Sequence, residues 1–157
     1  LKERGIEVFR VERGGDVTFH APGQIVAYPI INLTRHKISP KKHIFNLEEA
    51  MVKTLETFSI PAFRIQNLRG VFVKGNPPQK IGAVGVAISH GISFHGLALN
   101  VSIHPSEFEV ITPCGLKDYS VASMESFTNK SFQIDDVADV LVSQIKCIYG
   151  NSLLISP

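Results

Sequence analysis

Cys114 is the residue whose type and setting point most directly to covalent chemistry. It stands in the tripeptide Pro113-Cys114-Gly115, which follows a polar and irregular stretch. Proline and glycine are typical of a turn, and they leave the backbone amides beside the sulfur uncrowded. A cysteine thiolate in such a turn can form a covalent intermediate, so Cys114 is a candidate nucleophile. A cysteine that a loop merely tolerates is the alternative.

A nucleophilic thiol needs a neighbour that lowers its pKa from about 8.5. Histidine is the usual partner, but the chain has six and their spacing selects none of them. Lys80 is a second candidate, because it begins the apolar run 80–85, where a cation could be held against the wall of a pocket. A lysine at a strand end whose ammonium reaches water is the alternative.

The glycine-rich stretch 13–24 is a candidate ligand-binding loop, because paired glycines let a backbone approach a ligand closely. It matches neither the Gly-x-Gly-x-x-Gly pattern of dinucleotide sites nor a phosphate-binding loop, which needs Gly-Lys followed by Ser or Thr. Small residues recur in segments 82–85 and 95–100. Together these segments predict a narrow tunnel suited to an unbranched alkyl chain, with a tight strand crossing inside the core as the alternative.

Composition limits the class of protein. A chain of 157 residues with 44% hydrophobic and 19% charged residues indicates one soluble globular domain. The net charge of +2 is too small to predict nucleic-acid binding, and the basic clusters at 2–13 and 37–43 are interpreted as solvated surface, with an acidic partner as the alternative. The longest apolar stretch, 81–88, is too short to span a bilayer.

Cysteine usage favours a reducing compartment. The two cysteines, Cys114 and Cys147, lack the spacing of metal ligands or of a disulfide framework. Cys147 lies on the flank of the apolar side of a helix expected from Ile134 onward, and we expect it to be buried.

The elements that position these residues follow from hydrophobic periodicity. Ser39-Pro40 resembles the start of a helix, and apolar residues then recur at three- and four-residue steps from Ile44 to Phe58, which predicts about five helical turns. Strands are expected at 6–12, 25–33, 62–65, 70–73, 80–88 and 92–101, the last two as a hairpin. This order predicts a mixed sheet with helices packed on one face.

Four blocks in this order resemble the signature of the lipoate–protein ligase B family of octanoyltransferases: RGGDVTFHAPGQIVAYPIINL, KIGAVGV, SFHGLALNVS and ITPCGL. The resemblance extends from about Gly5 to about Tyr149. It implies an α/β (α+β) fold similar to the catalytic module of biotin and lipoate ligases, with residues 1–157 as one catalytic domain. It also implies that the N-terminal helix and strand of the family are missing from this chain.

The resemblance implies which residues form the site. The acyl-thioester cysteine falls on Cys114 and the thiol-activating lysine on Lys80, while His20 and His95 are expected to orient the pocket. Ala21 replaces a glycine that family members usually carry, which would matter if this residue needed a positive φ. The substrate-binding residues that the resemblance implies are Arg13, Gly14, Gly15, Asp16, Val17, Thr18, Phe19, His20, Ala83, Val84, Gly85, Gly96, Leu97 and Ala98.

The implied activity is an acyl transfer in two steps. Cys114 would take an octanoyl group from octanoyl-acyl carrier protein and pass it to a lysine of lipoyl domains, in 2-oxoacid dehydrogenase complexes and in the glycine cleavage H protein. Two substrates that visit in turn predict ping-pong kinetics. No metal or other cofactor is expected, because the donor is already a thioester, and neither nucleic acid nor membrane is an expected partner. The expected location is the cytoplasm, or the mitochondrial matrix in a eukaryote.

Two other functions are compatible with parts of this pattern. An ATP-dependent lipoate or biotin ligase shares the Arg-Gly-Gly type of loop, but it activates a free acid and needs no cysteine, so the Pro-Cys-Gly block argues against it. A truncated, non-catalytic module that binds acyl carrier protein or lipoyl domains is the second alternative.

Overall fold

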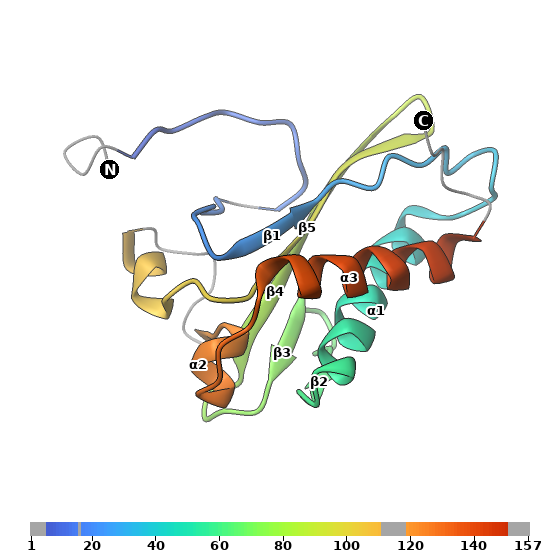
Figure 1. Cartoon of the computed structure of the whole chain (residues 1–157). Helices are drawn as coiled ribbons and strands as arrows, with labels where there is room; N and C mark the ends of the chain where they lie inside the picture. Colours follow the sequence, from blue (N-terminus) through green and yellow to red (C-terminus); the bar gives the residue numbers. More distant parts are fainter. Residues whose placement is uncertain (1–5, 16, 111–118, 151–157) are drawn as a thin grey trace.

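The computed structural model describes residues 6–15, 17–110 and 119–150 of the chain. Helices α1 and α3 lie side by side across one face of a twisted sheet, and this pair is called the helix layer below (Figure 1). The elements are β1 (Gln24–Ala27), α1 (Pro40–Thr57), β2 (Ala62–Phe63), β3 (Val71–Val73), β4 (Gln79–Ser89), β5 (Ile92–Asn100), the 3₁₀ helix η2 (Pro105–Val110), β6 (Ser120–Val121), α2 (Met124–Thr128) and α3 (Ile134–Tyr149).

The sheet has the order β1-β5-β4-β3-β2, and every neighbouring pair in this order is antiparallel. The two-residue strand β6 joins β4 in the parallel sense, beside Gln79 and Lys80. Here β6 lies along the same edge of β4 that β5 pairs with further on, because the pairing of β5 with β4 ends at Gly82. The expected mixed sheet with packed helices is therefore confirmed, and β4 is its central strand.

The start of α1 follows the predicted pattern. The Ser39 hydroxyl accepts a hydrogen bond from the Lys42 amide at 3.2 Å, and Pro40 occupies the first turn, where its missing N–H removes no helical bond. The helix then runs for 18 residues, which is five turns, as the spacing of its apolar residues predicts.

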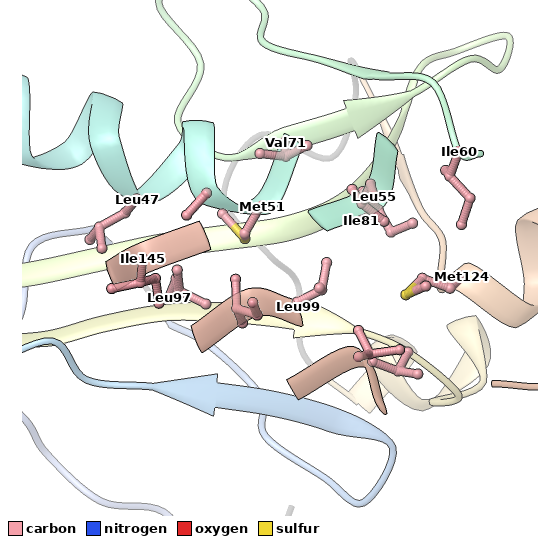
Figure 2. Packing of buried hydrophobic residues seen from close by; sticks show 14 of the residues in the cluster. Leu47, Met51, Leu55, Ile60, Val71, Ile81, Leu97, Leu99, Met124 and Ile145 are labelled. Carbon is pink, nitrogen blue, oxygen red and sulfur yellow. The ribbon is translucent and has the colours of Figure 1, made fainter. Parts of the chain in front are cut away.

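The core fills the space between α1 and the sheet. Figure 2 shows Met51 and Leu55 of α1 gathered with Ile81 of β4 and Leu99 of β5, all fully buried. Met51 packs so closely on Gly82 that a Cβ added to the glycine would lie 2.6 Å from the methionine sulfur. A side chain at this position would overpack the contact, which typically costs about 1–3 kcal/mol.

Helix α3 completes the helix layer. Its buried residues Val137, Leu141, Ile145 and Tyr149 recur every four positions; the sequence predicted the first three, with Ile148 expected in the place of Tyr149. The prediction for Cys147 is wrong, because its side chain is exposed. Two residues past Ile145 corresponds to a turn of about 200° around the helix, which places Cys147 on the solvent side.

Two strand predictions differ from the structure. Residues 6–12 form no strand, and the apolar side chains of Val8 and Phe9 in this segment are exposed. The predicted strand 25–33 ends at Ala27, because Pro29 cannot donate a ladder hydrogen bond. The alternation of residues 6–12 and the β-branched and aromatic residues of 25–33 overestimated both strands, since neither signal contains information about a partner strand.

The other long elements agree with the sequence. The hairpin of β4 and β5 and the short strands β2 and β3 lie where they were expected. The short elements η2, β6 and α2 lie in stretches for which no element was predicted. Within the described residues, no helix combines the length and the apolar character that crossing a membrane requires.

Candidate functional site

Lys80 lies in the central strand β4 where the register of the ladder is interrupted. Along β3, consecutive residues pair first with Gly82 and then with Lys80, so Ile81 is an extra residue, a β-bulge. Gly82 faces the helix layer, where it contacts Met51, and Ile81 belongs to the same core. The bulge therefore turns Lys80 to the opposite face of the sheet, called the outer face below.

Two aromatic rings flank the half-buried Lys80 side chain. Its Nζ atom lies 5.2 Å from the ring centre of Tyr119 and 5.8 Å from that of Phe72. The two rings meet edge to face with centres 5.5 Å apart, and both side chains are buried. An ammonium is attracted by the faces of such rings, so this setting holds a cation partly withdrawn from water.

Gly70 leaves room for the stem of the lysine. A Cβ added to Gly70 would lie 2.7 Å from Lys80 Cε and would also meet the carbonyl oxygen of Gly82. Its φ of +110° lies in the region that favours glycine. The Gly70 amide donates a hydrogen bond of 2.9 Å to Oε1 of the buried Glu48 on α1.

Beyond Lys80, two successive cross-strand pairs on the outer face of β4 and β5 carry only small side chains. Ala83 pairs with Ala98, and Gly85 pairs with Gly96, so two neighbouring cross-strand pairs contain nothing larger than a methyl group. These residues alternate with Gly82 along the strand and so share the face of Lys80. They form a flat strip, called the small-residue floor below.

The predicted ligand-binding loop rests on this floor. The Gly14 amide donates a hydrogen bond of 2.9 Å to the carbonyl of Val86, and a Cβ added to Gly85 would lie 3.1 Å from Arg13 Cδ. Two segments far apart in the sequence, residues 13–14 and 85–86, are therefore brought together.

A chain of hydrogen bonds connects the end of this loop to the strand of Lys80. His20 Nδ1 lies 3.2 Å from Gln24 Oε1, and Gln24 Nε2 donates to Asn100 Oδ1 at 2.8 Å. Asn100 Nδ2 then donates to the carbonyl of Ala122 at 2.9 Å, and the Ala122 amide donates to the carbonyl of Lys80 at 3.0 Å. Gln24 and Asn100 were missed by the sequence analysis, although a polar residue that ends the apolar run 92–100 is a signal of a buried hydrogen bond.

The other predicted site residues are less closely placed. Val84 and Leu97 pair with each other and point into the helix layer, so only their backbones can contribute to the outer face. Val17 is exposed, Thr18 is half-buried, and the Phe19 ring packs edge to face on Phe108 at 6.0 Å. Asp16 and Cys114 lie outside the described residues, as does Gly115.

Two further sequence expectations concern backbone conformation. Ala21 does not have a positive φ, so its methyl group meets no conformational barrier. His95 does have a positive φ, +59°, and its ring packs edge to face on Tyr28 with centres 5.5 Å apart.

The described residues show no metal cluster in this region, and one surface hollow lies elsewhere on the molecule. Among the described residues, no three His, Cys, Asp or Glu side chains are grouped as metal ligands would be. A cavity of about 280 Å³ lies instead at the start of α1, lined by Ser39, Lys41, Lys42 and Phe45. The candidate site is therefore defined by Lys80, its rings and the small-residue floor.

Comparisons with known proteins agree on one family. A family model described as the lipoyl protein ligase A/B catalytic domain matches residues 1–146. The octanoyltransferase of Thermosynechococcus vestitus is 42% identical over 146 residues, which are 93% of this chain and 63% of that protein. The octanoyltransferase of Koribacter versatilis is 38% identical over 156 residues, 98% of this chain and 62% of that protein. The chain thus spans about three fifths of the length of these relatives.

Solved structures show the same fold. A bipartite lipoate protein ligase from Thermoplasma acidophilum superposes with a TM-score of 0.70 at 18% identity, covering 94% of this chain and 59% of that one. A biotin protein ligase from Aquifex aeolicus gives a TM-score of 0.63 at 16% identity, covering 82% and 54%. The expected likeness to the biotin and lipoate ligase module is therefore confirmed at the level of the fold.

Proposed function

This chain belongs to the lipoyl protein ligase A/B catalytic domain family, and on that basis we propose that it transfers an octanoyl group from octanoyl-acyl carrier protein to a lysine of lipoyl domains. Its relatives in Thermosynechococcus vestitus and Koribacter versatilis bear the name octanoyltransferase. The observation that carries the proposal is the bulge at Ile81, because it turns Lys80 onto the face that also holds the small-residue floor.

The first step uses a thiolate stabilised by an ammonium. The Cys114 sulfur attacks the thioester carbonyl of the donor, the carbonyl–sulfur bond to the carrier breaks, and the carrier's sulfur leaves as a thiol with the proton that the Lys80 ammonium gives up. The charge of Lys80 favours the thiolate before the attack. Cys114 stands five positions before Tyr119 in the sequence, and the contact of Tyr119 with Lys80 supports pairing of this cysteine with the amine.

The second step forms an amide. The ε-amine of the acceptor lysine attacks the acyl-enzyme carbonyl, the bond to the Cys114 sulfur breaks, and the attacking amine loses a proton. Lys80 in its neutral form accepts that proton and so returns to the ammonium that the thiolate needs. The proposed acceptors are the lipoyl domains of 2-oxoacid dehydrogenase complexes and the glycine cleavage H protein, in the cytoplasm or, in a eukaryote, the mitochondrial matrix.

The small-residue floor suits the acyl chain. An unbranched alkyl group packs well on a flat apolar surface, and the pair Ala83–Ala98 provides one, next to the pair Gly85–Gly96, which Arg13 partly covers. Burial of each methylene group of the chain contributes about 0.8 kcal/mol to binding. Arg13 and Gly14 lie over one end of the floor, where they are proposed to contact the donor.

Intact-mass analysis after mixing with octanoyl-acyl carrier protein, without ATP, tests this function. We expect the wild-type chain to gain one octanoyl group, Cys114→Ser to gain none, and Cys147→Ser to behave as the wild type, since Cys147 is exposed on α3. A wild-type chain that gains no acyl mass, or Cys114→Ser that still acylates a lipoyl domain at the wild-type rate, would overturn the proposal. Transfer from free octanoate that requires ATP would favour the ligase alternative, and binding without transfer would favour the non-catalytic module.

A further inference from the structure

Glu48 is a carboxylate buried within the helix layer. It lies on α1 with 7% of its surface exposed, next to the core residue Leu47. A carboxylate removed from water in this way needs hydrogen bonds or opposite charges to remain stable. Its Oε1 atom accepts the hydrogen bond from the Gly70 amide at 2.9 Å.

Glu48 and Lys80 both contact Gly70. The Gly70 amide donates its hydrogen bond to Glu48. On the side of its Cα, Lys80 Cε lies 2.7 Å from the position that a Cβ would take. The hydrogen bond from Glu48 therefore fixes the peptide against which the stem of the lysine rests.

The charges around Glu48 indicate a second, electrostatic connection between Glu48 and Lys80. Burial raises the pKa of the Glu48 carboxyl, whereas the Gly70 amide and then the positive charges of Arg64, Arg69 and Lys80 lower it. Arg64 is already paired with Glu49, whose Oε2 lies 2.7 Å from its Nη1. Arg69 is exposed, so water screens its charge more than that of the half-buried Lys80.

We infer that Glu48 is a positioning residue for Lys80: it holds the Gly70 peptide that guides the lysine stem, and its negative charge keeps the amine protonated. The inference rests on the role proposed above for Lys80 and deepens it. In the resting enzyme Glu48 then favours the ammonium that stabilises a thiolate, and the arriving acceptor meets an amine that is already in place.

Trace labelling of amines across a pH series tests the charge. Only a neutral amine reacts with acetic anhydride, so the extent of labelling of the peptide that contains Lys80, measured by mass spectrometry, gives the pH at which half of Lys80 is neutral. Glu48→Gln keeps an oxygen that can accept the Gly70 hydrogen bond but loses the charge. We expect the labelling midpoint of Lys80 to fall by about one pH unit in this variant.

Glu49→Gln is the matched control. It removes a carboxylate from the next position of the same helix, but Glu49 pairs with Arg64 and Lys53, whereas the Gly70 amide donates to Glu48. We expect its Lys80 midpoint to equal that of the wild type. Equal midpoints for Glu48→Gln and the wild type, in folded proteins, would overturn the inference, as would an equal shift in the control.

A reciprocal measurement covers the case in which Glu48→Gln does not fold. Coupling between two sites is mutual, so loss of the ammonium in Lys80→Met must make Glu48 harder to ionise by a similar amount. We expect the titration midpoint of the Glu48 carboxyl carbon, followed by NMR, to rise by about one pH unit. An unchanged midpoint would contradict the inference.

These readouts are independent of acyl transfer. Labelling and NMR need no substrate, so a negative result there, together with normal acylation of the wild-type chain, would reject the role of Glu48 alone. Absence of the acyl-enzyme in the wild type would reject the proposed function and leave the measured coupling intact.

Discussion

The ring centre of Tyr119 lies 5.2 Å from the ammonium nitrogen of Lys80, and β6, which follows Tyr119 directly, pairs in parallel with the start of β4. The same amine lies 5.8 Å from the ring of Phe72 on the other neighbouring strand, β3. The strand β3 and the segment that leads into β6 thus build the surroundings of one cation. Each can be changed separately.

The charge of Lys80 can be removed while its apolar contacts are retained. Lys80→Met keeps a stem of similar length against the two rings, so the fold should persist. We expect octanoyl transfer to fall by about 10²–10⁴-fold, the usual contribution of a positioned acid or base. Steady-state transfer to a lipoyl domain measures this, together with the rate of Cys114 alkylation against pH.

Lys74→Met is the control for this change. Lys74 is exposed and lies in the turn that connects β3 to β4, the strand of Lys80. It should transfer octanoyl at the wild-type rate. If both variants were slowed equally, or if thiol alkylation in Lys80→Met followed the wild-type pH profile, the assigned role of Lys80 would be wrong.

Filling the small-residue floor should change the preferred acyl length. Ala83→Leu places three additional carbons where an alkyl chain is proposed to lie. We expect the ratio of kcat/KM for octanoyl over butanoyl donors to fall by about tenfold or more, in the range that a misplaced methylene group produces. Ala87→Leu, further along the same strand toward the hairpin turn, is the control, and an equal change in that variant would argue against the floor.

Acid should destabilise the fold through His43. This residue is fully buried, its Nδ1 lies 2.8 Å from the Tyr149 hydroxyl, and burial lowers its pKa from 6.5 to about 4. Between these values the unfolded chain binds a proton that the folded one does not. The free energy of unfolding should therefore fall as the pH falls from 6.5 to about 4, by about 3 kcal/mol in total.

Urea unfolding at pH 7 and at pH 4.5 measures this loss. In His43→Gln the side chain stays neutral at both values, so the difference between them should shrink by about 2 kcal/mol or more relative to the wild type. His36→Gln replaces a histidine outside the core and should keep the wild-type difference. A His43→Gln variant that loses as much stability in acid as the wild type would contradict the prediction.

The hydrogen bond between the side chains of Gln24 and Asn100 should be measurable as a coupling energy between these two residues. Asn100→Leu leaves the Ala122 carbonyl without its donor, which costs about 1–3 kcal/mol for a buried group. Gln24→Met alone should cost less, because Gln24 is only part-buried. In urea unfolding, we expect the double variant to lose less stability than the two single variants lose together, by at least about 0.5 kcal/mol. Strict additivity of the two losses would show that the two side chains act independently.

The long elements were predictable because their signals are local. Ser39 and Pro40 determine the start of α1 by their own chemistry, and the apolar run on each side of Ser89-His90-Gly91 is long enough to form a hairpin without help from other segments. Residues 6–12 show the limit of this approach, since their alternation is that of a strand but they pair with no strand in the part of the chain that the structure describes.

The site was predictable only in part. The small residues in the segments 82–85 and 95–100 meet because the hairpin pairs them, yet the same pairing sends Val84 and Leu97 to the helix layer. The direction of Lys80 depends on the bulge, which arises from the pairing of β3 with β4 and leaves no local signal. Glu48 had a signal that was overlooked: it stands three positions before Met51, on the apolar side of α1.

The strand β4 is hydrogen-bonded to neighbouring strands on both sides, whereas Gly14 contacts it from outside the sheet, by donating its amide hydrogen to the carbonyl of Val86. Local opening requires only the bonds of the segment that opens, so the two parts of the site differ in lifetime. The amide protons around Lys80 will exchange with solvent only when the sheet itself opens, and those of the loop far sooner. The backbone that carries Lys80 is therefore expected to outlast the contact of Gly14 with β4, so that the position of the proposed reactive amine does not depend on that contact.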